Sequence, residues 1–396
     1  MNVARVCAVG SGALRYLAYN GVTSRQTFYF ELFPFPQNTS LGLNQVFGNI
    51  CGIGLFQVTH LIASGWRSGD NKLYVVGSVL IGVGPRAREN LTMPVRTPVV
   101  AGQFYPVSRE QCQAELAEYA TVSVSTQEAG TAADRDRVEP AGRIDRPVGG
   151  IVPHAGWACS GSVAACVIRE LARDPALETF VVFGAVHRVS GIQASVFGRG
   201  SWRTPLGDIE IDEALASAVV SASPLIVADP DAHRLEHSIE VQVPFIRHFR
   251  SSVKLLPIMV PPSASSHEVG RIVGQKSREL GRVAAFLGST DLTHYGPRYG
   301  FVPHGVGPAA LKWAKDVNDR RLLEIVLDLQ ADRVVYEAER HHNACGSGAV
   351  AAAISACREK GASRALLLQH TTSYEVLRAR VGEMDDAVGY AGVIFG

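Results

Sequence analysis

The chain has 396 residues, of which 46% are hydrophobic and 19% charged, and its formal net charge is +1 at pH 7. This composition is that of a folded globular protein and excludes a disordered chain. The near-zero charge argues against a nucleic-acid partner, because phosphate binding requires a basic surface. Seven scattered cysteines without a CxxC pair exclude a disulfide scaffold and a cysteine-based structural zinc site. We therefore expect a reduced, cytoplasmic protein.

The charged residues are unevenly distributed along the chain. Residues 1–92 hold seven Lys or Arg and three Asp or Glu, a net charge of +4, whereas residues 93–396 hold 31 and 34, a net charge of −3. The stretch from Leu32 to Trp66 has no charged residue, but its prolines, asparagines and glutamines argue against a membrane span. Apart from a strand-like segment at 73–83, the hydrophobic residues of this part of the chain show no clear helical or strand periodicity. We expect residues 1–92 to be a poorly ordered extension outside the functional domain, with Met93 as the natural start of translation.

The elements after Met93 follow in a regular order. Ser108 and Gln111 predict a capped helix that runs to Tyr119, and residues 121–147 have the composition of an exposed loop. Strands are predicted at 149–154, 179–186, 253–260, 282–289, 364–369 and 388–396. Helices are predicted at 160–173, 212–222, 239–249, 266–280, 308–328, 331–341 and 346–360. Apolar strands that alternate with helices indicate an α/β fold, a three-layer α/β/α sandwich with a mostly parallel or mixed central sheet, over residues 93–396.

Polar residues follow several of the predicted strands. His154 ends the first strand of this series, His187 follows the second, Asp291 and His294 follow the fourth, and His370 follows the fifth. In open α/β sheets, ligands bind beyond the carboxyl ends of the strands. These side chains therefore converge if the strands run parallel, and together they indicate a metal or catalytic site.

Cys345 and His237 are two further candidates. Cys345 precedes a predicted helix, whose N-terminus would stabilise a thiolate as a nucleophile or as a ligand for a soft metal. The alternative is a small residue packed beneath the neighbouring glycines. His237 lies in LEHSIEVQVPF, near a predicted helix start, where it fits an acid/base group or a helix-cap residue.

Six segments in the same order resemble the Memo family, whose bacterial and archaeal members are called AmmeMemoRadiSam system protein B. The resemblance extends from Val99 to Gly396, and six ordered segments are far more specific than any one alone. The segments are VVAGQFYP (99–106), IVPHAGW (151–157), FGAVHR (183–188), EHSIEVQVPF (236–245), STDLTHYG (289–296) and NACGSGA (343–349).

The resemblance implies a fold similar to that of class III extradiol dioxygenases, which are α/β proteins with an iron site. The metal-binding trio of the Memo family is two histidines and one cysteine, and by motif it falls on His154, His187 and Cys345. The dioxygenases use two histidines and a carboxylate, and a thiolate in its place favours copper, zinc or a redox-active iron.

The family's other pocket residues fall on His237, Asp291 and His294, and these are the expected catalytic residues. His237 and His294 would act as acid/base groups, and Asp291 would orient His294. The expected substrate contacts are Trp157, Arg188 and Tyr295. Arg188 stands where animal Memo proteins carry a second histidine, and its charge would attract an anionic substrate.

Three functions remain open at this point. The first is a metal-dependent oxidoreductase, dioxygenase-like or oxidase-like, which binds iron or copper, or zinc, and acts on a small molecule or peptide. The second is a metal-independent hydrolase or transferase with Cys345 as the nucleophile. The third is a non-catalytic module that binds a peptide or protein. The family name implies radical SAM and AMMECR-type proteins as partners.

Overall fold

The computed structural model describes residues 93–121, 143–187 and 193–396, together with the backbone of four strands within the first 92 residues. The chain divides into two compact units, Met1–Thr92 and Met93–Gly396. In the first unit, the strands β1 (Val6–Val9), β2 (Gly12–Ala18), β3 (Gln26–Leu32) and β4 (Leu73–Val79) form an antiparallel sheet. The strand predicted near residue 73 is therefore confirmed, and the other three strands were not predicted.

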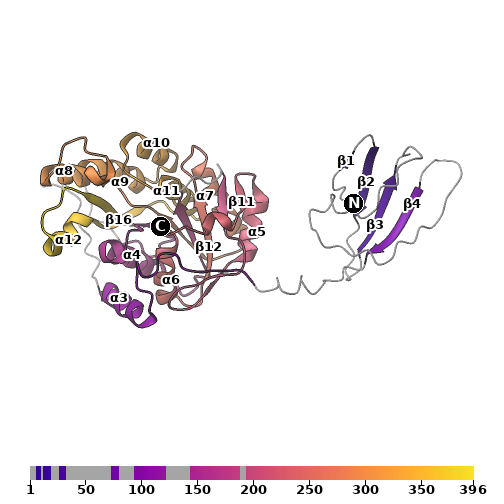
Figure 1. Cartoon of the computed structure of the whole chain (residues 1–396), viewed down its shortest axis with the longest axis horizontal. Helices are drawn as coiled ribbons and strands as arrows, with labels where there is room; N and C mark the ends of the chain where they lie inside the picture. Colours follow the sequence, from indigo (N-terminus) through magenta and orange to yellow (C-terminus); the bar gives the residue numbers. More distant parts are fainter. Residues whose placement is uncertain are drawn as a thin grey trace. The chain divides into compact units, whose positions relative to one another are not determined.

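The second unit is built around a mixed sheet of nine strands (Figure 1). At its centre, β12 (Lys254–Val260), β7 (Thr179–Ala185), β13 (Ala284–Ser289) and β6 (Gly149–Val152) lie side by side and all run parallel. The strand β16 (Ala387–Phe395) pairs antiparallel with β6 and with β15 (Ala365–Thr372). Shorter strands extend the sheet at its margins: β8 (Ala194–Val196), β11 (Ile226–Ala228) and β14 (His294–Tyr295).

Helices cover both faces of this sheet. One face carries α5 (Glu213–Ala222), α7 (Ser266–Glu279), α9 (Arg320–Leu327), α10 (Ala331–His341) and α11 (Ser347–Glu359). The other face carries α3 (Arg109–Thr121), α4 (Trp157–Leu171) and α6 (Val243–Phe249) (Figure 1). Two further helices, α8 (Pro308–Trp313) and α12 (Ser373–Val381), lie near β14 and β15, respectively.

The alternation of side chains along the central strands explains why both faces are covered. In β7, Val181 and Phe183 pack into one hydrophobic core, whereas Phe180 and Val182 pack into the other. Successive side chains of a strand point to opposite faces, so a continuous apolar run must be buried on both sides. The three-layer α/β/α fold expected from the sequence is confirmed.

The structure also differs from the predicted elements in a few places. The helix predicted over 308–328 is interrupted by a π-helical segment, Ala314–Asp319, between α8 and α9. The short strands β8 to β11 and β14, among them β9 (Ser201–Trp202) and β10 (Ile209–Glu210), were not predicted, because two or three residues carry no readable period. Most of the loop predicted at 121–147 lies outside the described residues. No helix in the described part of the chain is long and apolar enough to cross a bilayer.

Candidate metal centre

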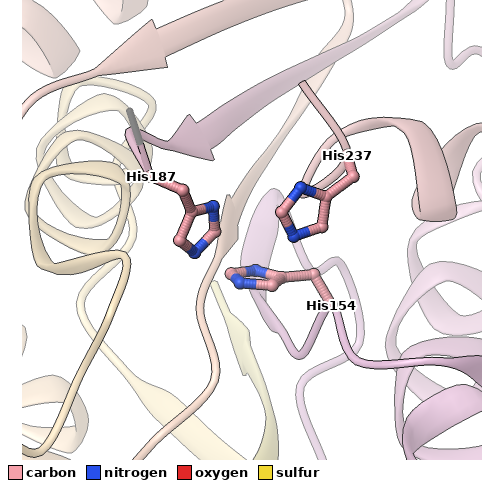
Figure 2. A group of neighbouring side chains, drawn as sticks. All are labelled: His154, His187 and His237. Carbon is pink, nitrogen blue, oxygen red and sulfur yellow. The ribbon is translucent and has the colours of Figure 1, made fainter. Parts of the chain in front are cut away.

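Three histidines come together at the carboxyl edge of the parallel strands (Figure 2). His154 lies two residues after β6, and His187 lies two residues after β7. Because both strands run parallel to β13, which lies between them, their carboxyl ends reach the same edge of the sheet. His237 enters from the loop that precedes the short 3-10 helix Glu240–Gln242. Backbone topology therefore positions two of the three rings, and a loop positions the third.

The spacing of these rings suits a shared metal ion. One nitrogen of each histidine lies within 4.8 Å of the corresponding nitrogens of the other two. The ring centroids of His154 and His187 are 5.0 Å apart, those of His187 and His237 are 4.7 Å apart, and those of His154 and His237 are 5.8 Å apart. Imidazole nitrogens at about 2.0–2.1 Å from a metal lie roughly 3.4 Å from each other in a tetrahedral site. Small side-chain rotations would close the observed spacing to that value.

The electrostatics of this cluster favour neutral imidazoles, which are the form that binds a metal. Burial, together with the positive charges that His187, His237 and His294 would carry, lowers the pKa of His154 well below its usual range. Desolvation of the ring and the charges on His237 and His294 also lower the pKa of His187. At neutral pH, protons therefore do not compete with a metal ion for these two rings.

Cys345 lies against the histidine cluster without joining its compact group of nitrogens. Its Sγ is 3.2 Å from His154 Nε2, and it accepts a hydrogen bond of 3.4 Å from the backbone N–H of Asp291. Burial and the nearby Asp291 carboxylate raise the pKa of the Cys345 thiol far above its usual range. In the absence of a metal, Cys345 is therefore a thiol, and a metal ion that recruits it must displace its proton.

Asp291 joins two segments of the site. Its Oδ1 accepts the backbone N–H of His154 at 2.7 Å, and its backbone oxygen accepts the N–H of Cys345 at 3.2 Å. Burial raises the pKa of the Asp291 carboxyl to about 6. The sequence suggested that Asp291 orients His294, whereas in the structure its hydrogen bonds go to the segments that carry His154 and Cys345.

His294 follows β13 as predicted, whereas His370, expected just after a strand, lies within one, and only His294 is near the cluster. His294 donates from Nδ1 to the Leu292 carbonyl at 3.1 Å, and its charge influences both His154 and His187. His370 lies inside β15, where its Nε2 is 3.1 Å from Asp319 Oδ2. His370 is therefore bound to a buried carboxylate and does not belong to the three-histidine group.

Two of the residues expected to contact substrate, Trp157 and Tyr295, are buried in the protein core. Trp157 is buried, stacks on Tyr105 with ring centroids 5.3 Å apart, and donates from Nε1 to the Val241 carbonyl at 3.1 Å. Tyr295 is fully buried and donates its hydroxyl hydrogen to the Gly305 carbonyl at 2.9 Å. These contacts are those of core residues, and they leave a substrate role for either residue as a prediction only. Arg188 lies outside the described residues.

Ser289 and Asn318 support the site and were not identified from the sequence, whereas Asn343 was expected to orient the Cys345 turn. Ser289, the last residue of β13, lies 3.0 Å from His154 Nδ1. Asn318, in the π-helical segment, donates to Thr293 Oγ1 at 3.0 Å and to the His341 carbonyl at 2.9 Å. Asn343 donates to the Asn318 carbonyl at 2.9 Å, which ties the turn before Cys345 to that segment. A π-helical segment within a helix often marks a functional site, but no sequence pattern predicts it.

The three-layer fold and the histidine cluster together define an α/β protein with a candidate metal centre at the carboxyl edge of its parallel strands. The sequence model of the Memo-like protein family matches residues 96–394. A MEMO1 family protein of Thermococcus onnurineus is 35% identical over 308 residues, which cover 76% of this chain and 99% of the relative. A second, from Methanothermobacter thermautotrophicus, is 35% identical over 314 residues, which cover 75% of this chain and 99% of that relative. A third, from Methanosarcina barkeri, is 33% identical over 306 residues, with 76% and 99% covered.

The chain belongs to the Memo family. The alignments cover nearly the whole length of each relative, and the residues that the family model matches lie within the second unit, Met93–Gly396. The family expected from the six sequence segments is thus confirmed.

Proposed function

We propose that His154, His187 and His237 hold a single transition-metal ion and that the protein is a metal-dependent redox enzyme. The observation that carries this proposal is the convergence of three imidazole nitrogens within 4.8 Å of one another. Cys345, which contacts His154 Nε2, is the candidate fourth ligand. Imidazole and thiolate donors suit iron, copper and zinc.

A cavity beside the cluster provides room for a substrate. Its volume is about 470 Å³, within the range of small-molecule sites. The wall is largely apolar, and His187, His237 and Glu236 supply its polar groups; the other lining residues are Val99, Val100, Ala185, Ala232, Leu235 and Met259. A small molecule, or one side chain of a peptide, would therefore bind with its reacting group next to two of the three histidines.

The surrounding residues have distinct roles in this proposal. A bound iron or copper ion would supply one-electron redox chemistry and the activation of O₂. His294 donates from Nδ1 to a backbone carbonyl, so its Nε2 carries the lone pair that a general base needs. Asp291 holds the segments of His154 and Cys345 in register through its carboxylate and its backbone.

The contact between Cys345 and His154 is also the geometry of a cysteine nucleophile with its base. A reactive cysteine, however, requires a lowered pKa, and the pKa of Cys345 is raised by burial and by Asp291. We therefore prefer a metal ligand to a metal-independent nucleophile at this position.

Oxygen consumption tests the redox proposal. Protein loaded anaerobically with Fe(II) and freed of unbound iron would be exposed to O₂ with ascorbate as the electron donor. We expect the wild type to consume O₂ faster than a His154→Ala/His187→Ala double variant treated in the same way. Equal consumption by a wild type that retains iron would reject the redox role and favour non-catalytic binding. The radical SAM and AMMECR-type proteins implied by the resemblance would then be the first partners to examine.

A further inference from the structure

Ser289 lies beside Nδ1 of His154, whereas Cys345 lies beside Nε2 of the same ring. Ser289 is the last residue of β13 and is fully buried. Its Oγ is 2.7 Å from the Ser238 carbonyl and 3.0 Å from His154 Nδ1. Ser289 is therefore the hydrogen-bond partner of the His154 nitrogen that Cys345 does not contact.

The direction of these hydrogen bonds follows from counting protons. A serine hydroxyl has one hydrogen, and a carbonyl oxygen can only accept. When both contacts are hydrogen bonds, the hydrogen of Ser289 therefore goes to the Ser238 carbonyl. Ser289 Oγ can then only accept from His154, which requires a proton on His154 Nδ1 and leaves the lone pair on Nε2.

The side chain of Ser238 is held by hydrogen bonds to β7 and to its own loop. Ser238 is fully buried, its Oγ accepts the backbone N–H of Ala185 at 2.9 Å, and it donates to the carboxylate of Glu236. The carbonyl that receives the Ser289 hydrogen is thus held by contacts with β7 and with its own loop. If the hydroxyl of Ser289 turned toward His154, it would give up its hydrogen bond to this carbonyl.

We propose that Ser289 is a positioning residue that holds His154 in the Nδ1–H tautomer and so leaves the lone pair on Nε2, the nitrogen that faces Cys345. The proposal rests on the metal site proposed above for its consequence, but the tautomer itself is a property of the metal-free protein. A ligating histidine commonly donates its other ring N–H to an oxygen acceptor, which fixes its orientation, and loss of such a partner costs 10–100-fold in metal affinity.

The same arrangement determines how Cys345 faces His154. With its lone pair on Nε2, His154 accepts the S–H of Cys345 across the 3.2 Å contact. In the other tautomer, Nε2–H would face the sulfur, and Nδ1 would face a serine oxygen that has no hydrogen left to donate. Ser289 therefore favours the state in which only the Cys345 proton must leave when a metal ion binds.

Histidine tautomers can be read directly by NMR of the metal-free, ¹⁵N-histidine-labelled full chain. In the wild type we expect His154 to carry its proton on Nδ1. In Ser289→Ala the backbone of residue 289 still interacts with the ring, so we expect a partial shift of the proton toward Nε2. We also expect a 10–100-fold larger dissociation constant for Zn²⁺. Ser289→Thr keeps the hydroxyl and should restore both readouts.

Ser277→Ala is the matched control, because Ser277 is also a fully buried serine whose hydroxyl donates to a backbone carbonyl, that of Arg282, away from the cluster. It should change neither the tautomer nor the zinc affinity. A wild-type His154 with its proton on Nε2 would overturn the proposal, as would a folded Ser289→Ala variant with an unchanged tautomer. Failure of the wild type to bind Zn²⁺ would reject the metal site but leave the tautomer measurement decisive for Ser289.

Discussion

At the scale of single residues, the site combines imidazoles that are already neutral with a thiol that is not yet a thiolate. Burial and the charges of neighbouring histidines lower the pKa of His154, and partial desolvation with the charges of His237 and His294 lowers that of His187. Burial and Asp291, in contrast, raise the pKa of Cys345. Metal binding at neutral pH therefore requires no proton loss from these two histidines. It requires the loss of one proton from Cys345 if the sulfur ligates.

Zinc affinity should therefore depend on pH through Cys345. Between about pH 6.5 and 8.5, below the raised pKa of the thiol, the association constant should rise about tenfold per pH unit, because each ion displaces one proton. In Cys345→Ser the pH dependence should be nearly flat. Titration calorimetry in buffers of different ionisation enthalpy counts the released protons directly. Identical proton release in wild type and variant would show that Cys345 does not bind zinc as a thiolate.

How far the sequence predicts the site differs from residue to residue. His154 and His187 could be placed because each follows an apolar strand, and parallel strands end at one edge of the sheet. His237 was expected at the site as an acid/base group, but its grouping with the other two rings as a possible metal ligand depends on the path of a loop. The role of Ser289 depends on a carbonyl 51 residues away, which no local pattern reveals.

At the scale of elements, the site depends on the close approach of α11 to the end of β13. Gly346 is the N-cap residue of α11, and a Cβ atom there would lie 2.2 Å from the Ser289 carbonyl oxygen. Only glycine permits this contact, and the contact sets the position of Cys345, the preceding residue. The strands and long helices of the second unit were predictable from their apolar patterns, whereas this approach depends on packing between distant segments.

We expect Gly346→Ala to destabilise the protein by about 1–3 kcal/mol, as overpacking of a buried contact does. It should also weaken zinc binding, because the turn that carries Cys345 must move away from β13. Urea denaturation and zinc titration measure the two effects. Gly198→Ala is the control, since a Cβ atom there meets its nearest neighbour at 3.7 Å. A Gly346→Ala variant as stable as this control would contradict the packing argument.

At the scale of the whole molecule, the second unit contains everything that the proposed function uses. Both large hydrophobic cores, the sheet and the histidine cluster lie within Met93–Gly396, and the family match begins at residue 96. The composition of residues 1–92 predicted a segment outside the functional domain, and this stays a prediction.

A protein that consists only of residues 93–396 should therefore fold cooperatively and bind the same amount of metal as the full chain. Circular dichroism during thermal unfolding and metal analysis of the two proteins test this expectation. A truncated protein that is unfolded, or that is folded but has lost its metal, would give the first 92 residues a structural or functional role.

The central claim, that the three histidines form a metal centre, is tested most directly by the metal content of purified protein. Inductively coupled plasma mass spectrometry would compare the wild type with His187→Ala and with His267→Ala, which removes a histidine on α7 that is outside the cluster. We predict about one ion per chain in the wild type and in His267→Ala, and almost none in His187→Ala. A His187→Ala protein that retains as much metal as the wild type would contradict the account.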